Sequence, residues 1–193
     1  MTNEFDNSQN EKSLKPNQFK TPQIAIHWAT LALVAIVIAI GFGSDLIEAR
    51  ATKHLAMDIH RLLGLIIGLL VLARLAMRLG NRSPDLETPL PLRLAGAASQ
   101  GAMYLLLVGM PIIGLMQTSA ARAHPTLFGV IPLPVLTAHD RDLADSLGEW
   151  HERGAWVLIA VIGLHAAAAL WHHYGRKDDV LTRMAPWIKT RRA

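Results

Sequence analysis

The sequence predicts an all-α membrane protein built as a bundle of four transmembrane helices. Three observations support this fold class. Apolar residues make up 51% of the 193 residues and charged residues only 18%, below the roughly 25% that soluble proteins carry. The apolar residues gather in four windows, each long enough to cross a hydrocarbon core about 30 Å thick. Histidines, which are rare and costly inside a membrane, recur within these windows.

The four expected helices cover residues 24–43, 55–79, 95–118 and 150–173. The first and last windows are almost purely apolar. The third contains Pro111, which membrane helices tolerate because neighbouring groups satisfy the freed backbone. Residues 1–20 are polar, so we expect a disordered cytoplasmic tail. We assign residues 21–187 to the membrane domain and residues 188–193 to a basic C-terminal tail.

The distribution of charge predicts how the bundle lies in the membrane. With both termini on one side, that side has thirteen of the 19 Lys and Arg residues and the other side has six. The positive-inside rule then places both termini in the cytoplasm. This asymmetry accounts for the net charge of +4, and we expect no nucleic-acid partner. The sequence has no cysteine, which excludes a c-type haem, a thiolate-held iron–sulfur cluster and disulfides.

Besides His172 and His173 at the end of the fourth window, the expected helices contain four histidines: His27, His60, His151 and His165. Because helix direction alternates, His27 and His165 share a depth near the cytoplasmic side, and His60 and His151 share one near the periplasmic side. Along the fourth helix, His151 and His165 are fourteen residues apart, which is about 21 Å along the axis and about 40° around it. Bis-imidazole ligation of haem iron needs two histidines from different helices at one depth. The sequence therefore predicts two stacked haems and an electron path between them.

Each of these residues also has a structural alternative. A single membrane histidine is as often a hydrogen-bonded packing residue as a ligand. A metal transporter would also place histidines in the membrane, although carboxylates or thiols usually accompany them and only Asp58 lies near. Gly64 and Gly68 share a broad face with His60, and they make room either for a flat macrocycle or for close helix packing.

Six segments resemble the bacterial cytochrome b-561 family: QIAIHW (23–28), DIHRLLG (58–64), LARLAMRLG (72–80), DSLGEWHERGAW (145–156), VIGLHAAAALWHHY (161–174) and RKDDVLTRMAP (176–186). The resemblance covers about residues 22–187, and within the family it is greatest to four-helix, di-haem members that oxidise superoxide. It implies two b haems, one ligated by His27 and His165 and the other by His60 and His151, which is the pairing that depth predicts. It also implies that periplasmic superoxide gives electrons through both haems to ubiquinone near the cytoplasmic side. Two superoxide ions, two protons and one quinone would give two dioxygen molecules and one quinol.

Two arginines beside the periplasmic ligands, Arg61 and Arg153, are candidate catalytic residues that would attract superoxide together with other cations on that side. They lie outside the family's motifs, and carboxylates crowd the same side, so solvated loop charge is the alternative. A member of the family also has extra histidines at the start of the third helix. The corresponding segment here, GAASQGAMY, has none, so their role does not transfer.

The candidates for the quinone end are Arg74, Arg78 and His172. Both arginines return to the face of His60 near the cytoplasmic side, where a guanidinium fork would bind haem propionates or a quinone carbonyl. Their alternative is snorkelling to lipid headgroups. His172 matches a position that the family links to the quinone, and a histidine there would relay protons. Its alternative is an interfacial anchor.

The leading functional prediction is therefore a superoxide:ubiquinone oxidoreductase. The first alternative is a quinol-linked transmembrane electron carrier that serves a protein partner, such as a periplasmic redox protein. The second alternative is a metal transporter without haem.

Overall fold

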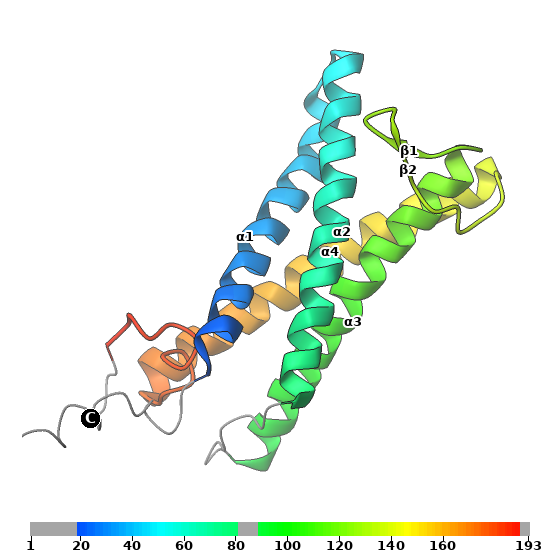
Figure 1. The fold of residues 1–193 in the computed structure, drawn as a ribbon. Coiled ribbons are helices and arrows are strands. Elements are labelled where there is room, and N and C mark those ends of the chain that lie inside the picture. Colours follow the sequence, from blue (N-terminus) through cyan, green and yellow to red (C-terminus); the bar gives the residue numbers. More distant parts are fainter. Residues whose placement is uncertain (1–18, 81–88, 190–193) are drawn as a thin grey trace, which may run out of the picture.

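A computed structural model of the chain describes residues 19–80 and 89–189 (Figure 1). Its four long helices are α1 (Thr21–Gly43), α2 (Arg50–Gly80), α3 (Leu90–Ala121) and α4 (Arg141–Trp171). All four are long and apolar enough to cross a membrane, as predicted for a bundle of four helices. The shorter elements are η1 (Ser44–Leu46), β1 (Thr126–Leu127), β2 (Ile131–Pro132) and η2 (His172–Arg176). Most of the two predicted tails, at residues 1–18 and 190–193, lies outside the described residues.

The helices extend beyond the apolar windows that predicted them. Helix α4 begins at Arg141, nine residues before its window, because the Asp140 carboxylate accepts the backbone N–H of Leu143 at 3.1 Å and caps the first turn. At its other end α4 stops at Trp171, and the π-helical turn η2 begins at His172. The end of the predicted window at residues 172–173 therefore belongs to η2 and not to α4.

Neighbouring helices in the sequence are also neighbours in space. Helix α1 packs beside α2, α2 beside α3, and α3 beside α4 (Figure 1). A buried cluster joins three of the helices through Val34 of α1, Ile67 and Val71 of α2, and Leu158 of α4. Outward-facing apolar side chains such as Leu105, which is 75% exposed, suit a surface that meets lipid. The interior is thus small, and it lies halfway along the helices.

The connection from α3 to α4 contains a β-hairpin that the sequence did not predict. Its strands β1 and β2 are antiparallel and are joined by residues 128–130, in which Phe128 and Gly129 have φ angles of 53° and 74°. Two positive φ angles define a type I′ turn, which a bulky residue such as phenylalanine rarely enters. The backbone N–H of Phe128 donates to the Asp58 carboxylate at 3.1 Å, so this turn is tied to α2. We call this end of the bundle the hairpin end.

Hydrogen bonds hold the rest of this connection against the end of α3. The hydroxyl of Ser119, which is almost fully buried, accepts the backbone N–H of Leu136 at 3.2 Å. The carbonyl of Ala120 accepts both the Asp140 backbone N–H at 3.0 Å and a ring N–H of His139 at 2.8 Å. The last carbonyls of a helix lack partners within the helix, so these contacts satisfy one of them and fix the loop.

The opposite end of the bundle, which we call the termini end, is closed by residues 178–189. This C-terminal strap lies against the start of α1 (Figure 1). Trp28 Nε1 donates to the carbonyl of Met184 at 2.7 Å, and the rings of Trp28 and Trp187 are 5.3 Å apart. Ala185 is completely buried. The strap is therefore a packed part of the fold.

Candidate functional site: two histidine pairs

The structure brings the four membrane histidines together as two pairs. His27 of α1 faces His165 of α4 with ring centres 6.5 Å apart, and His60 of α2 faces His151 of α4 with ring centres 6.1 Å apart. A metal–imidazole bond is about 2 Å long and the ring centre lies about 1 Å further on, so two rings across one iron have centres roughly 6 Å apart. Both pairs therefore have a spacing that fits bis-imidazole ligation.

Glycines let the rings of the His60–His151 pair approach neighbouring helices. A Cβ added to Gly41 of α1 would lie 3.1 Å from Cε1 of His60, and one added to Gly114 of α3 would lie 3.1 Å from Cε1 of His151. Behind the first glycine, His60 Nδ1 donates to the Val37 carbonyl at 2.9 Å. Since this bond places the proton on Nδ1, Nε2 of His60 keeps its lone pair for a metal.

A cation lies beside the other pair. The guanidinium of Arg74 donates to Nδ1 of His27 at 2.8 Å, and it is close enough to His165 to act on it electrostatically. A neutral His27 in this arrangement has its proton on Nε2, so iron binding at Nε2 would displace that proton. Arg74 thus lies at the termini end, where its spacing from His60 predicts it. Its partner there is the ring of His27.

The buried cluster separates the two pairs. Leu158 lies midway between the two histidines of α4, and Val34 lies seven residues beyond His27 on α1. Seven residues of helix span about 10 Å, so an apolar layer fills the middle of the bundle between the pairs.

The two predicted catalytic arginines are each held by a carboxylate of their own helix. Arg61, which is partly buried, forms a 2.7 Å ion pair with Asp58. Arg153 is exposed and pairs with Glu149 at 3.0 Å. Because a carboxylate neutralises each of these arginines, the hairpin end is less positive than a cluster of unpaired cations would be.

Two polar groups line the interface of α2 and α3 near the termini end. Arg78 donates a hydrogen bond to Gln100, and its guanidinium lies over the ring of Tyr104 at 6.0 Å. Gln100 and Tyr104 thus fix the orientation of a predicted quinone-site arginine.

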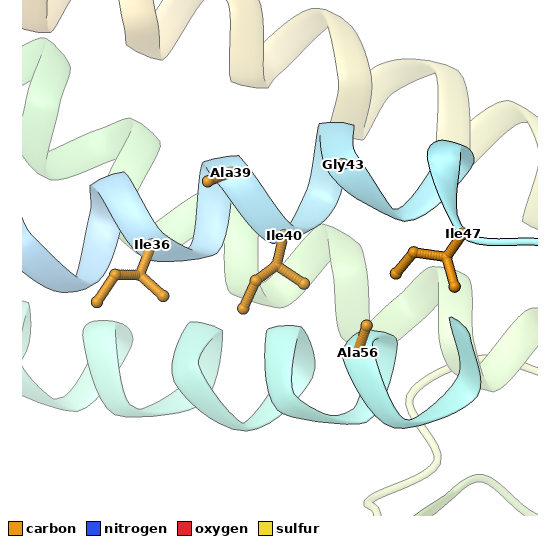
Figure 2. Close-up of a pocket in the computed structure, with 6 residues that line it drawn as sticks. All are labelled: Ile36, Ala39, Ile40, Gly43, Ile47 and Ala56. Atoms are coloured by element: carbon orange, nitrogen blue, oxygen red, sulfur yellow. The ribbon is translucent and has the colours of Figure 1, made fainter. Parts of the chain in front are cut away.

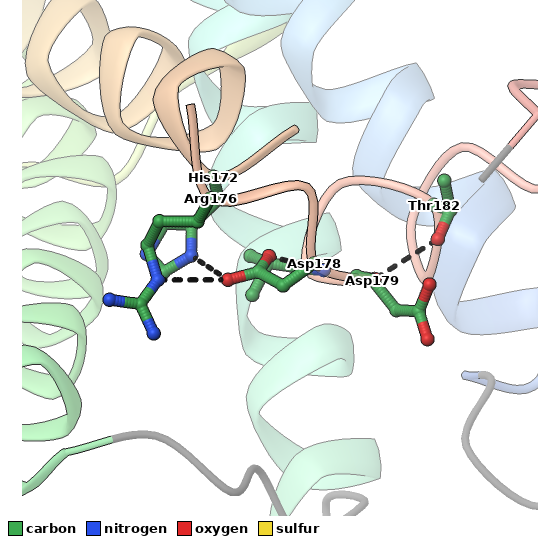
Figure 3. A network of polar contacts seen from close by, with 6 residues as sticks. His172, Arg176, Asp178, Asp179 and Thr182 are labelled. Carbon is green, nitrogen blue, oxygen red and sulfur yellow. Dashed lines mark hydrogen bonds and ion pairs between the residues drawn. The ribbon is translucent and has the colours of Figure 1, made fainter. Parts of the chain in front are cut away.

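His172 has a partner that sequence reasoning missed. Its Nδ1 lies 2.6 Å from Oδ2 of Asp178, and Nε of Arg176 donates to the same oxygen at 3.2 Å (Figure 3). The chain turns back through η2 and through Lys177, whose φ is 55°, and this reversal brings Asp178 to His172. Burial raises the pKa of Asp178, but hydrogen bonds from His172, the Val180 backbone and Arg176 outweigh it and hold that pKa below its ordinary value. In the sequence, the acidic pair that follows Arg176 and Lys177 was the signal that could have revealed this partner of His172.

An apolar groove of about 320 Å³ lies between α1 and α2 (Figure 2). It is lined by Ile36, Ala39, Ile40, Gly43, Ile47 and Ala56. Lining side chains without polar atoms give a hydrocarbon chain a surface to contact, but they give a quinone head no hydrogen-bonding partner. The groove is therefore a poor candidate for the reactive site.

Comparison with known proteins agrees with this geometry. Residues 18–187 match the family model for prokaryotic cytochrome b561. The chain belongs to the prokaryotic cytochrome b561 family. It is 36% identical to a probable superoxide oxidase CybB of Yersinia pestis, over 85% of this chain and 93% of that protein. It is also 28% identical to cytochrome b561 homolog 1 of Escherichia coli (strain K12), over 88% of this chain and 98% of that protein. Cytochrome b561 homolog 2 of the same strain is 29% identical over 88% of this chain and 92% of that protein.

Membership in this family makes the chain a membrane electron carrier and implies haem b. The histidine pairs fit that cofactor on two counts. Their ring spacing matches ligation across one iron, and the Gly41 and Gly114 seats fix ring positions at one of the pairs.

Proposed function

We propose that this chain is a di-haem b cytochrome that takes electrons from superoxide and passes them to ubiquinone. The observation that most supports it is the presence of two histidine pairs with ligand spacing, one toward each end of a membrane bundle. Identity of 36% to a probable superoxide oxidase supports the choice of electron donor. Membership in a prokaryotic membrane family supports a bacterial inner-membrane location. The distribution of Lys and Arg supports an orientation with the hairpin end periplasmic and the termini end cytoplasmic.

In this proposal the four histidines would hold two b haems through Nε2, which for His27 requires the ring proton to leave Nε2. Haem, when bound, supplies reversible one-electron transfer. The chain orients the ligands: the Val37 carbonyl fixes His60, and Arg74 contacts His27. The buried cluster around Leu158 excludes water from the middle of the bundle.

At the hairpin end, Arg61 and Arg153 attract the superoxide anion and raise its encounter rate. Asp58 and Glu149 hold these cations in place, and they also weaken the attraction. Two superoxide ions each lose one electron there and leave as dioxygen.

At the termini end, Arg78 and Arg74 offer donors to a quinone oxygen. His172 is oriented through Nδ1 by Asp178, so it exchanges a proton at Nε2. One ubiquinone accepts two electrons and two protons there and leaves as the quinol.

A second candidate is a quinol-linked carrier that gives its electrons to a periplasmic redox protein. The pairing of Arg61 and Arg153 with carboxylates favours it, because paired cations attract a small anion less strongly. The hairpin also presents an apolar tip, in which Val130 is 76% exposed, for contact with a protein.

Stopped-flow mixing of the purified oxidised protein with superoxide and ubiquinone distinguishes the candidates. Rapid haem reduction with quinol accumulation, slowed by rising ionic strength, supports the superoxide oxidase. Haems that stay oxidised with superoxide but become reduced with quinol support the carrier. A colourless protein would contradict both. His60→Ala should bind one haem, whereas His124→Ala, a change at an exposed loop histidine, should bind two.

A further inference from the structure

We propose that this chain holds the reduction potentials of its two haem sites apart through the Nδ1 partners of His27 and His60, so that electrons run from the hairpin end to the termini end. The inference rests on the proposed di-haem function. Its basis is an asymmetry in the protein: a guanidinium faces His27, and a backbone carbonyl faces His60. Val37 thus acts through its ligand as a positioning residue, and Arg74 acts through its charge.

The cation at His27 favours the reduced state of its site. Iron binding at Nε2 of His27 would leave the ring proton on Nδ1, so Arg74 would then act through its charge and not through this hydrogen bond. A guanidinium stays charged at every physiological pH, and the Arg74 group lies 2.8 Å from the ring. Arg78 lies near enough to Arg74 to repel it, so a second positive charge adds to the field. Charge interactions are strong where water is scarce. An added electron at the His27–His165 pair is therefore stabilised, and the reduction potential of that site rises.

The carbonyl at His60 has the opposite effect. Donation from Nδ1–H to the Val37 carbonyl makes the imidazole a more basic ligand, which favours oxidised iron. Gly41 makes this contact accessible, because it lies four residues after Val37 and has no Cβ to block the ring.

His151 repeats the same arrangement on α3. Its ring lies against Gly114, and its Nδ1 lies near the carbonyl of Met110, four residues earlier, without closing a full hydrogen bond. Both ligands at the hairpin end thus face a glycine and the carbonyl one helical turn before it. The closed hydrogen bond of His60 therefore carries the lowering of the potential at the His60–His151 site.

The direction of this offset suits the proposed reaction. Moving an electron from the periplasmic to the cytoplasmic side carries negative charge toward the negative side of the membrane, which the membrane potential opposes. A higher potential at the termini end counteracts that opposition and keeps electrons near the quinone.

Potentiometric titration of the haem-loaded protein tests the inference without an activity assay. Arg74→Gln should move one midpoint to a more negative value and leave the other unchanged. The equilibrium share of electrons on the affected haem should fall about tenfold, which corresponds to about 59 mV for one electron. Arg74→Lys, which keeps the charge, should retain most of the offset. Arg78→Gln, an equal loss of charge one turn further along α2, should cause a smaller shift.

A His60→Ala background, which retains only the His27–His165 site, identifies the affected haem. Arg74→Gln in that background should shift the single remaining midpoint. Two bound haems with no shift in Arg74→Gln, or with equal shifts in both, would overturn the inference and leave the proposed function standing. Fewer than two haems in the unmodified protein would instead refute the proposed function.

Discussion

A methyl group at Gly41 should disturb one haem ligand and spare the rest of the bundle. In Gly41→Ala the added Cβ would lie 3.1 Å from Cε1 and 3.4 Å from Nδ1 of His60. Carbon atoms in contact prefer about 3.5–4.0 Å, so the ring must move away by a few tenths of an ångström. Movement away from α1 also lengthens the 2.9 Å hydrogen bond from His60 to the Val37 carbonyl.

Two opposing terms set the size of the effect on stability. Overpacking of this kind costs about 1–3 kcal/mol. Replacing glycine by alanine within a helix gains about 1 kcal/mol. We therefore expect Gly41→Ala to lower the free energy of unfolding by about 0–2 kcal/mol. Gly101→Ala is the matched control, because nothing lies within 4 Å of its added Cβ, and it should gain the full helix term.

Thermal unfolding in detergent measures the stability term, and low-temperature electron paramagnetic resonance of the ferric protein measures ligand geometry. Gly41→Ala should change the signal of one haem, and Gly114→Ala should change the signal of the same haem, because His151 meets Gly114 at the same 3.1 Å distance. If Gly41→Ala raised the melting temperature as much as Gly101→Ala and left both haem signals unaltered, the assignment of Gly41 as a ring seat would be wrong.

Three further predictions concern the ends of the bundle. Asp58→Ala removes the acceptor of the Phe128 N–H, so it should cost about 1.5–3 kcal/mol and speed amide exchange at Phe128; unchanged exchange would contradict the anchoring role. Trp28→Phe loses the bond to the Met184 carbonyl, so it should cost about 1 kcal/mol and expose the strap to limited proteolysis, whereas equal protection would argue against that contact. The depressed pKa of Asp178 contributes stability above its ordinary pKa of about 3.9, and this is lost as pH falls through the folded-state value. Asp178→Asn should therefore be less stable than the unmodified protein at pH 7 and equally stable near pH 2, which thermal unfolding at both pH values checks.

Hydropathy predicted the four helices because a chain in lipid must satisfy its backbone hydrogen bonds within each segment. It did not predict where α4 begins, since residues 141–149 carry charge and lie outside the apolar window. The cap at Asp140 was a readable signal for that start. The hairpin was less accessible, because its strands are two residues long and Phe128 holds a position where Asn, Asp or Gly is expected.

Some contacts of the candidate site could likewise be predicted from the sequence, and others could not. Helical periodicity and alternating direction were enough to predict the partners of His27 and His60, because both depend only on distance along straight helices. The ion pair of Arg153 with Glu149 was also readable, as residues four apart on a helix are neighbours. The contact between His172 and Asp178 was not, because it depends on a π-helical turn and a left-handed residue that no periodic pattern describes.

The separation of the two histidine pairs bears on how the molecule handles charge. Val34, Ile67, Val71 and Leu158 are buried between the pairs, and none of these side chains has a polar atom. A proton crossing this layer would need a chain of hydrogen-bonding groups, and polar groups without partners are costly in an apolar interior. An electron needs no such chain. In the proposed function, the middle of the bundle therefore passes electrons and blocks protons. The protons that the proposed quinone reaction takes up at the termini end would then arrive from that end, where His172 lies.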